Sequence, residues 1–487
     1  MWGAEAAGVA CSASAATFHA SRPLHWRRFS EEAAGNRTMS EQFHVIVIGG
    51  GTGGMCLAHG LKRAGISVAV YERDRTRSDG LYGYRVGIDP DGSRALHKCL
   101  PPELYEVFVA TCARPPQHFN MLDEDFKEFL SLRLREADDP INSEKSVSRI
   151  TLRQVLLTGI EDVIHFDKTF ERYETNSDGT VTAYFEDGTS ATGNVLVAAD
   201  GTGSRVRKQY LPHAKVVPAG IISIAGKVPL TNSTKDLLPP KVFLGISTIF
   251  APKGYFGIIH VMEFKWDRSG AVKLDIGGSD AELIANWPGL LYDNTRDYIN
   301  WGFAAATKRF STNVMKLSGD ELISLVRDMT PNWSPNFHTL LELTDVGTCF
   351  PINIATSEPI PAWPTTNVTL LGDAIHTMTP GRGVGANTAL RDAALLTRKL
   401  IDVREGKLPL IRAVSEYEAK MIDYGFRAVL DSRKQQSGDD VVHKPVVGRM
   451  ALGCLRTTMR VANHLPAVKR KMTDNLYRYR GAERGDE

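Results

Sequence analysis

The sequence predicts an α/β protein whose framework is a parallel sheet of the doubly wound type. Three short runs of largely apolar residues, 45–48, 195–199 and 368–371, are typical of strands buried on both faces of such a sheet. A loop rich in glycine or carrying a carboxylate follows each run, and doubly wound sheets bind their ligands at these strand ends. The 487 residues, 43% hydrophobic and 23% charged, suit two connected globular domains.

The first strand leads into a glycine-rich loop at residues 49–54 with the pattern GxGxxG. In this pattern Gly49 permits a tight turn, Gly51 lets the backbone approach a pyrophosphate, and Gly54 lets the following helix pack closely on the strand. The next predicted strand ends in Glu72, a carboxylate suited to accept hydrogen bonds from an adenosine ribose. The order of strand, loop, helix, strand and acid predicts dinucleotide binding and leaves the choice between NAD and FAD open.

Two further motifs follow the other predicted strands. A DGxxSxVR segment runs from Asp200 to Arg207. Much later, Gly-Asp-Ala at 372–374 precedes a glycine-rich run at 381–387, which opens a predicted amphipathic helix. Each motif therefore places polar groups at the carboxyl end of a parallel strand.

Together the three motifs resemble the fingerprint of the class A FAD-dependent monooxygenases, the para-hydroxybenzoate hydroxylase-like aromatic hydroxylases, over about residues 43–400. The resemblance implies a Rossmann-like FAD-binding domain with a β-meander, interleaved with a mixed-sheet α+β substrate domain. It implies that the first loop holds the ADP half of FAD and that Asp373 binds the ribityl chain. It also places Asp200 near the pyrophosphate and the helix start at 383–387 against the flavin ring.

The resemblance also assigns arginines to the cofactor. Arg85 stands where family members place an arginine over the FAD pyrophosphate. Arg149 and Arg153 lie four residues apart on one face of a predicted helix, and the sequence leaves open which of them reaches the cofactor. Guanidinium groups suit phosphates in a partly closed site. The expected cofactor-binding residues are Gly49, Gly51, Gly54, Glu72, Arg85, Arg149, Arg153, Asp200, Asp373, Gly383, Gly385, Ala386 and Asn387.

By this resemblance the protein is a flavoprotein oxidoreductase, a monooxygenase that uses NAD(P)H and O₂. It would hydroxylate a small, largely apolar organic substrate, aromatic or polycyclic, through a flavin C4a-hydroperoxide. No second GxGxxG follows a strand, so NAD(P)H is expected as a transient co-substrate without its own domain. Two alternatives stay open: a related-fold flavoprotein reductase or oxidase acting on an isoprenoid or similar lipophilic molecule, and a non-enzymatic flavin-binding protein.

No catalytic residue and no metal site are predicted. His376 lies inside the third motif, where a packed or backbone-bonded histidine is favoured over a catalytic one. Five residues of the middle region are candidates for the substrate pocket, although each is also explained as a core residue. They are Tyr255, Phe256, His260, Trp301 and Phe303.

The expected layout has five parts. They are a disordered or targeting extension (1–40), a first FAD-binding part (41–215), a substrate domain (216–345), a second FAD-binding part (346–430) and a C-terminal helical tail (431–487). Within them we expect a β-meander over 165–191, strands over 221–228, 242–250, 256–264 and 298–306, and a helix opened by a capping box of Ser318 and Glu321.

Composition excludes several classes of partner. A net charge of +2 predicts no nucleic-acid partner, and no apolar stretch approaches the roughly 18 residues that span a bilayer. The basic amphipathic segment 444–471 suits either packing on the protein's own body or peripheral contact with an anionic membrane. Six scattered cysteines predict small buried thiols. We therefore expect a soluble cytoplasmic protein, with organelle targeting by the Arg- and Ser-rich segment 1–38 as an open alternative.

Overall fold

The computed structural model describes residues 43–77, 85–134, 139–264, 297–438 and 440–481. In these residues the three apolar runs form neighbouring strands of a five-stranded, wholly parallel sheet in the order β17-β11-β1-β2-β7. The strands are β1 (His44–Ile48), β2 (Ser67–Tyr71), β7 (Ile164–His165), β11 (Val195–Ala198) and β17 (Val368–Leu370). The predicted α/β fold class is confirmed.

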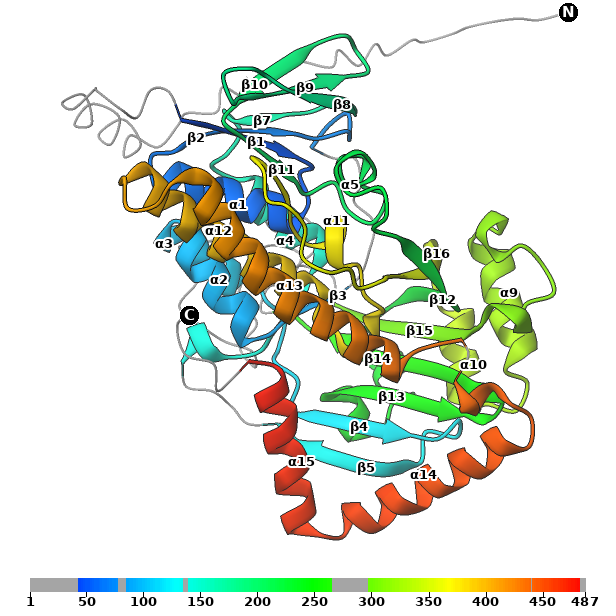
Figure 1. Cartoon of the computed structure of the whole chain (residues 1–487). Helices are drawn as coiled ribbons and strands as arrows, with labels where there is room; N and C mark the ends of the chain where they lie inside the picture. The colour runs from blue at the N-terminus through cyan, green and yellow to red at the C-terminus, as the bar shows by residue number, and fades with distance from the viewer. Residues whose placement is uncertain (1–42, 78–84, 135–138, 265–296, 439, 482–487) are drawn as a thin grey trace, which may run out of the picture. The chain divides into compact units, whose positions relative to one another are not determined.

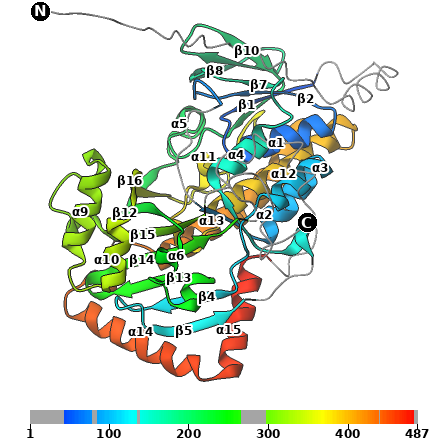
Figure 2. The same ribbon diagram turned by 180° about the vertical axis from the view of Figure 1, so that it is seen from behind.

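The parallel sheet is covered on both faces, as its apolar strands require. Helices pack on one face and an antiparallel meander lies on the other (Figures 1 and 2). The meander, predicted over 165–191, consists of β8 (Phe170–Thr175), β9 (Val181–Phe185) and β10 (Ser190–Gly193). The helices of this part are α1 (Thr52–Arg63), α2 (Pro90–Cys99), α3 (Pro102–Ala110), α4 (Arg149–Leu157), α5 (Arg205–Tyr210), α11 (Asp373–His376), α12 (Gly385–Arg404) and α13 (Leu410–Gln435).

A second, seven-stranded sheet has the order β16-β12-β15-β14-β13-β4-β5. It is mixed, because β13 and β4 run parallel while the other neighbours run antiparallel. Its strands are β4 (His118–Leu122), β5 (Glu128–Arg133), β12 (Val216–Pro229), β13 (Gly245–Ala251), β14 (Tyr255–Met262), β15 (Tyr298–Ala306) and β16 (Asp345–Ser357). The predicted domain boundaries stay predictions, and β4 and β5 join this sheet from the range assigned to the first FAD-binding part.

Helices α9 (Gly319–Met329) and α10 (Pro335–Glu342) cover one face of this sheet, and α9 begins with the predicted capping box of Ser318 and Glu321. The strand expected over 242–250 starts later than predicted. Residues Pro240–Phe243 form a short helix, α7, because Pro240 at its first position favours helix initiation. A further short helix, α6 (Asn232–Lys235), precedes it.

A two-stranded antiparallel ribbon, β3 (Arg85–Ile88) and β6 (Lys145–Ser148), connects the two parts. Helix α4 starts directly after β6, so Arg149 is its first residue. At the other end of β3, α2 begins at Pro90 with Asp89 as its N-cap. The ribbon therefore joins the helices of the parallel sheet to the region beside the seven-stranded sheet.

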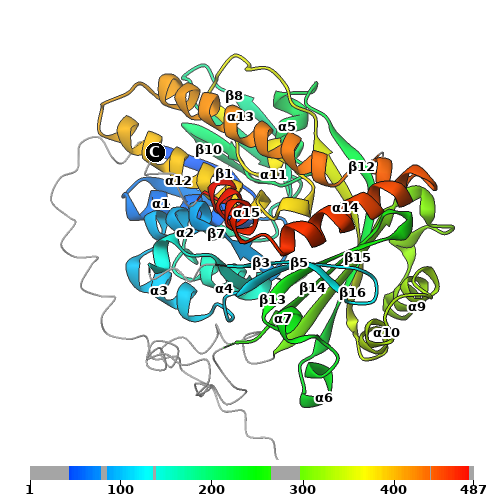
Figure 3. The same cartoon turned by 90° about the horizontal axis from the view of Figure 1, so that it is seen from below.

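The C-terminal segment forms two helices, α14 (Val447–Asn463) and α15 (Pro466–Tyr479), along the β5 edge (Figure 3). Pro466 starts α15, since proline cannot continue the preceding helix. Met459 and Met472 pack against the cluster around Phe129, which confirms packing on the protein's own body. Membrane contact stays a prediction. No helix in the part of the chain that is described is long and apolar enough to cross a bilayer.

Four of the cysteines, Cys56, Cys99, Cys112 and Cys349, are buried free thiols as predicted. The expectation of burial is wrong for Cys454, which is exposed on α14 because this helix packs through only one of its faces.

Candidate functional site

The three sequence motifs meet at the carboxyl edge of the parallel sheet. Strands β1, β11 and β17 are adjacent, and Ile48, Ala198 and Leu370 are register partners at their ends. The glycine loop follows β1, Asp200 follows β11, and Asp373 follows β17 at the start of α11. Segments more than 300 residues apart in the chain thus form one edge (Figure 1).

Two glycines of the first loop are fixed by close backbone packing. Gly49 has φ +108°, and a Cβ there would lie 2.4 Å from the carbonyl oxygen of Ala199. A Cβ at Gly54 would lie 2.2 Å from the oxygen of Gly49. Gly51 differs, because its Cβ would meet only the Ala199 oxygen at 3.9 Å, and the residue is exposed. The loop therefore makes a tight turn and leaves open space beside Gly51.

Glu72 and Arg153 hold this loop from its two sides. The Glu72 carboxylate accepts hydrogen bonds from the backbone N–H groups of Gly50, at 2.5 Å, and Asp74, at 2.9 Å. Arg153 donates to the Gly50 carbonyl at 3.0 Å and to the Asp74 carboxylate at 2.9 Å. Because an ionised carboxylate has about four acceptor positions, Glu72 retains capacity for a ligand hydroxyl.

Arg149 lies in a different place from Arg153, although both belong to one face of α4. Arg149 is exposed, and its charge acts on the carboxylate of Asp373. Desolvation raises the pKa of Asp373, while His376 and Arg149 oppose that rise. Arg153 therefore lies at the glycine loop and Arg149 lies toward Asp373, and which of them contacts the cofactor stays a prediction.

Asp200 and Arg207 order the second motif. One oxygen of Asp200, Oδ2, accepts from the backbone of Arg205 at 2.9 Å, while Oδ1 is buried without a partner among the described residues. The buried guanidinium of Arg207 donates to the carbonyl of Ala374 at 2.7 Å and to that of Thr202 at 2.9 Å. Arg207 therefore ties the second motif to the third. It stood in the DGxxSxVR pattern, but its partner lies too far along the chain for the sequence to reveal.

Behind Asp373 lies a buried ion pair. Asp392 of α12 accepts from Nε2 of His376 at 2.6 Å, from the backbone N–H of Gly372 at 2.7 Å, and from the Tyr424 hydroxyl at 2.5 Å. The expectation of a packed histidine at His376 is confirmed. Asp392 was missed, since nothing in the sequence separates it from a solvated helix residue.

The pair makes stability depend on pH. Burial would lower the pKa of His376, but Asp392 and Asp373 raise it above its ordinary value. The stabilisation from the charged histidine is therefore fully present below about pH 6.5 and is lost as the pH rises through the higher folded-state pKa. Compared with His376→Asn, we expect the wild type to unfold with about 1–3 kcal/mol more free energy at acidic pH. Denaturant titrations at several pH values should show that this difference in unfolding free energy becomes smaller as the pH rises. A difference that does not change with pH would contradict the charged pair.

The start of α12 lies beside the same edge. Gly383 has φ +64°, and no atom lies within 4 Å of where its Cβ would be. Gly385 and Ala386 are partly exposed. Asn387 is buried; it accepts from the backbone N–H of Asp89 at 3.0 Å and donates to the Gly87 carbonyl at 2.9 Å. Asn387 thus fastens α12 to β3 and α2.

The chain matches the FAD binding domain family model over residues 358–416. A solved structure from Photorhabdus luminescens, assigned as an FAD-containing monooxygenase, is 33% identical and aligns with a TM-score of 0.69 over 81% of this chain and 97% of its own. This chain belongs to the class A FAD-dependent monooxygenase family. Its cofactor is FAD.

This monooxygenase is also similar to two further proteins. The dual O-methyltransferase/FAD-dependent monooxygenase CTB3 of Cercospora beticola is 33% identical over 395 residues, which are 77% of this chain and 44% of CTB3. The chain thus spans less than half of that relative. Klebsiella pneumoniae HpxO, solved with FAD and uric acid, is 22% identical with a TM-score of 0.69, covering 90% of this chain and 97% of HpxO. At that identity the likeness shows the fold alone.

The edge fits FAD in three respects. Open space lies beside Gly51 and Gly383, where backbone can approach a ligand closely. Neither α1 nor α12 receives a side-chain cap, so their N-terminal amides and partial positive charge remain for phosphates or a flavin ring. The buried Oδ1 of Asp200 lacks a partner among the described residues.

The structure does not bring Arg85 to the glycine loop. Its Nε donates to Ser146 at 2.8 Å, and its charge acts together with those of Glu144 and Arg480. It also acts on His260 of the seven-stranded sheet. The predicted contact of Arg85 with the FAD pyrophosphate stays untested, and its observed neighbours lie elsewhere.

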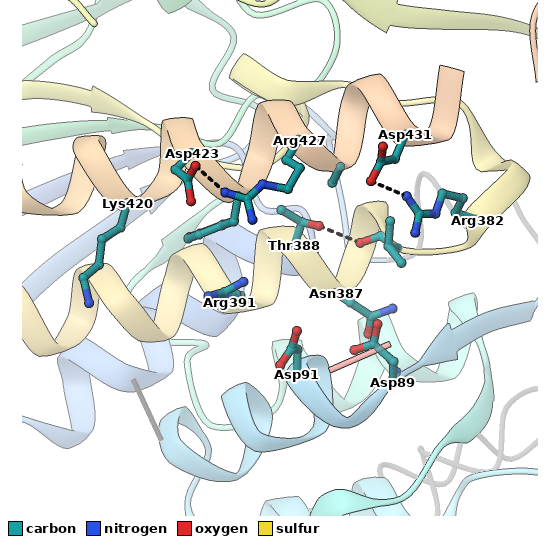
Figure 4. A pocket seen from close by; sticks show the side chains of 13 residues that line it. Asp89, Asp91, Arg382, Asn387, Thr388, Arg391, Lys420, Asp423, Arg427 and Asp431 are labelled. Carbon is teal, nitrogen blue, oxygen red and sulfur yellow. Dashed lines mark hydrogen bonds and ion pairs between the residues drawn. The ribbon is translucent and has the colours of Figure 1, made fainter. Parts of the chain in front are cut away.

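A cavity of about 440 Å³ lies among α2, α12 and α13 (Figure 4). It opens on the face of α12 that carries Asn387 and Arg391. Ala389, between these two residues, packs instead on Gly372 at the FAD edge. Since residues two apart on a helix point about 200° apart, the cavity lies on the far side of α12 from that edge. Its charged lining includes Asp91, Lys420, Asp423 and Arg427.

Proposed function

We propose that this monooxygenase uses NAD(P)H and O₂ to hydroxylate a small, largely apolar organic molecule, aromatic or polycyclic. The observation that carries the proposal is the meeting of three motif loops and two uncapped helix N-termini at one sheet edge. When bound there, FAD supplies the redox chemistry, accepting a hydride from NAD(P)H and activating O₂. The chain's own residues bind and orient it.

The ADP half of FAD would lie on the first loop. Gly51 admits the pyrophosphate to the backbone at the start of α1, and Glu72 accepts from the ribose while it holds Gly50. Arg153 fixes the same loop and contributes positive charge near the phosphates. Asp200 would approach the pyrophosphate through its unpartnered oxygen.

The flavin half would lie between Asp373 and α12. The Asp373 carboxylate is exposed at the first residue of α11, where it can accept from a ribityl hydroxyl. The N-terminus of α12, from Gly383 to Asn387, carries the positive end of a 20-residue helix. Negative charge on the pyrimidine edge of a reduced flavin would be stabilised there.

We propose that separate parts of the chain bind the cofactor and the substrate. Residues 41–215 and 346–430 would form the FAD-binding part, and 216–345 the substrate part. The seven-stranded sheet supports this division, with the addition of β4, β5 and β16 to the substrate part.

The test is substrate-dependent turnover by the FAD-loaded protein. We expect aromatic test compounds to accelerate NAD(P)H consumption, with O₂ uptake and a product that incorporates one atom of isotopically labelled oxygen. Oxygen-independent turnover would instead support the reductase alternative. If a broad panel neither bleaches the flavin with NAD(P)H nor yields an oxygenated product, the enzymatic proposal is wrong.

A further inference from the structure

The two faces of strands β14 and β15 have opposite surroundings. On one face Tyr255, Trp301 and Phe303 belong to the core beneath α9 and α10, with the Tyr255 and Phe303 rings 5.2 Å apart. Side chains alternate along a strand, so His260 and Asn300 project from the other face. These two residues are register partners on neighbouring strands. Of the candidate pocket residues, three are therefore core residues and His260 is not part of that core.

His260 and Asn300 each bury a polar atom that has no partner in the described residues. They are 3% and 8% exposed. His260 Nδ1 lies 3.3 Å from the Gly245 carbonyl, so Nδ1 carries the hydrogen and Nε2 presents a lone pair. Among the residues that the structure describes, neither Nε2 of His260 nor Oδ1 of Asn300 has a hydrogen-bond partner. An unpaired buried acceptor is unfavourable, and two in register point to a ligand that completes them.

Along β14 and β15 their neighbours on this face are small or apolar, while on β12 Lys227 is the register partner of Asn300. Gly302 and Ala304 continue β15, and Phe256 and Ile258 continue β14. Phe256 packs with Ala304 and Ile354 in a separate small cluster. An apolar surface with two acceptors at one end suits a flat, mostly apolar molecule with a polar edge.

Arg85 brings positive charge to the same end. Its side chain keeps some exposed surface, while desolvation lowers the pKa of its guanidinium to about 10. Burial, together with the charge of Arg85, holds the pKa of His260 well below its usual range, so the imidazole stays neutral. Arg85 lies on β3, and two residues later Gly87 accepts from Asn387 in the first turn of α12. The polar end of the sheet face is thus linked to the proposed flavin side.

We propose that Arg85, His260 and Asn300 form the polar end of the substrate site and select an aromatic ring that carries a free hydroxyl. The hydroxyl donates to Nε2 of His260, and its oxygen accepts from the Arg85 guanidinium. Oδ1 of Asn300 takes a second donor, a neighbouring hydroxyl or N–H. This inference rests on the proposed function. A substrate without a donor would leave both buried acceptors unpaired.

Matched ligand pairs test the inference directly. The probes are 2-naphthol with 2-methoxynaphthalene, and 2,3-dihydroxynaphthalene with its dimethyl ether, titrated against FAD-loaded protein by flavin difference absorbance. In the wild type we expect the hydroxylated member to bind about tenfold or more tightly than its ether, as one hydrogen bond implies. His260→Phe should remove most of this preference and leave the ether's affinity unchanged.

Stability provides a second readout. Because Asn300→Leu removes an unpaired buried acceptor, we expect its Tm without ligand to stay equal or to rise. His260→Phe removes an unpaired acceptor but also the hydrogen bond to the Gly245 carbonyl, so a small fall in its Tm is expected while the ether still binds as in the wild type. Asn353→Leu is the matched control, since Asn353 is exposed on β16 of the same sheet. It should change neither ligand preference nor Tm. A lowered Tm with both ligands weakened equally would show that His260 is structural and would overturn the inference.

The outcomes separate this inference from the proposed function. If neither hydroxylated probe binds more tightly than its ether, the inference is overturned whether or not oxygenated products form. If the preference holds but no probe or related phenol is oxygenated, the polar site stands and the proposed function fails.

Discussion

Replacing Asp373 with alanine is expected to leave a folded protein that binds FAD more weakly. The carboxylate is exposed at the start of α11, and no hydrogen bond to it comes from the described residues. Desolvation nevertheless raises its pKa, so the carboxylate is a partly desolvated group that no hydrogen bond from the described residues satisfies. A ribityl hydroxyl donating to a charged acceptor contributes about 1.5–3 kcal/mol. Its loss predicts FAD binding weaker by about 10- to 100-fold.

The measurement is the flavin-to-protein absorbance ratio after gel filtration, followed by titration of the apoprotein with FAD. Asp373→Asn should fall between the wild type and alanine, because the amide still accepts but lacks the charge. Asp236→Ala is the control, since Asp236 is also an exposed aspartate but lies at the C-terminal end of α6, outside the three motifs. Unchanged FAD content in Asp373→Ala would remove Asp373 from the proposed site.

Replacing Gly49 with alanine is expected to damage both stability and cofactor binding. Its φ of +108° is unfavourable for any residue with a Cβ, at a cost of roughly 1–2 kcal/mol. The added atom would also lie 2.4 Å from the carbonyl oxygen of Ala199, and forcing room for it typically costs about 1–3 kcal/mol more. Since Ala199 belongs to the loop after β11, any relief of this clash must move two of the three motifs apart.

Gly188→Ala provides the matched control for this prediction. Gly188 also has positive φ, +81°, but no atom lies within 4 Å of its would-be Cβ. Gly188→Ala should therefore lose only the stability that the unfavourable φ costs, and it should bind FAD as the wild type does. Denaturant unfolding and FAD titration of both variants give the comparison; equal losses at the two positions would show that the clash at Gly49 contributes nothing.

Local signals predicted the parts of the fold in which each residue's neighbours lie nearby in the chain. The unit from β1 to Glu72, the strand Tyr298–Ala306 and the capped start of α9 are of this kind. Pairing between distant segments carries no such signal. Strand β4 joins β13 across more than 100 residues, and the sequence of β4 does not reveal that partner.

The same distinction holds within the site. The glycines and Asp373 were predicted because their backbone positions define a motif. The hydrogen-bond partners of Asp392 lie 16 or more residues away, and Ala374, which Arg207 joins to the second motif, lies 167 residues away, so these roles required the structure. The sequence also could not predict which groups surround the Arg85 side chain, because they depend on how the β3–β6 ribbon lies against the seven-stranded sheet.

Glu72 and Arg153 hold Gly50 from both sides through contacts made within the protein. A glycine-rich segment left to itself samples many conformations, and ordering it on association would consume part of the binding free energy. Here that ordering is completed during folding, by a carboxylate and a guanidinium from separate elements. At the proposed site a pyrophosphate would meet a preorganised cradle, and its interactions would go into affinity.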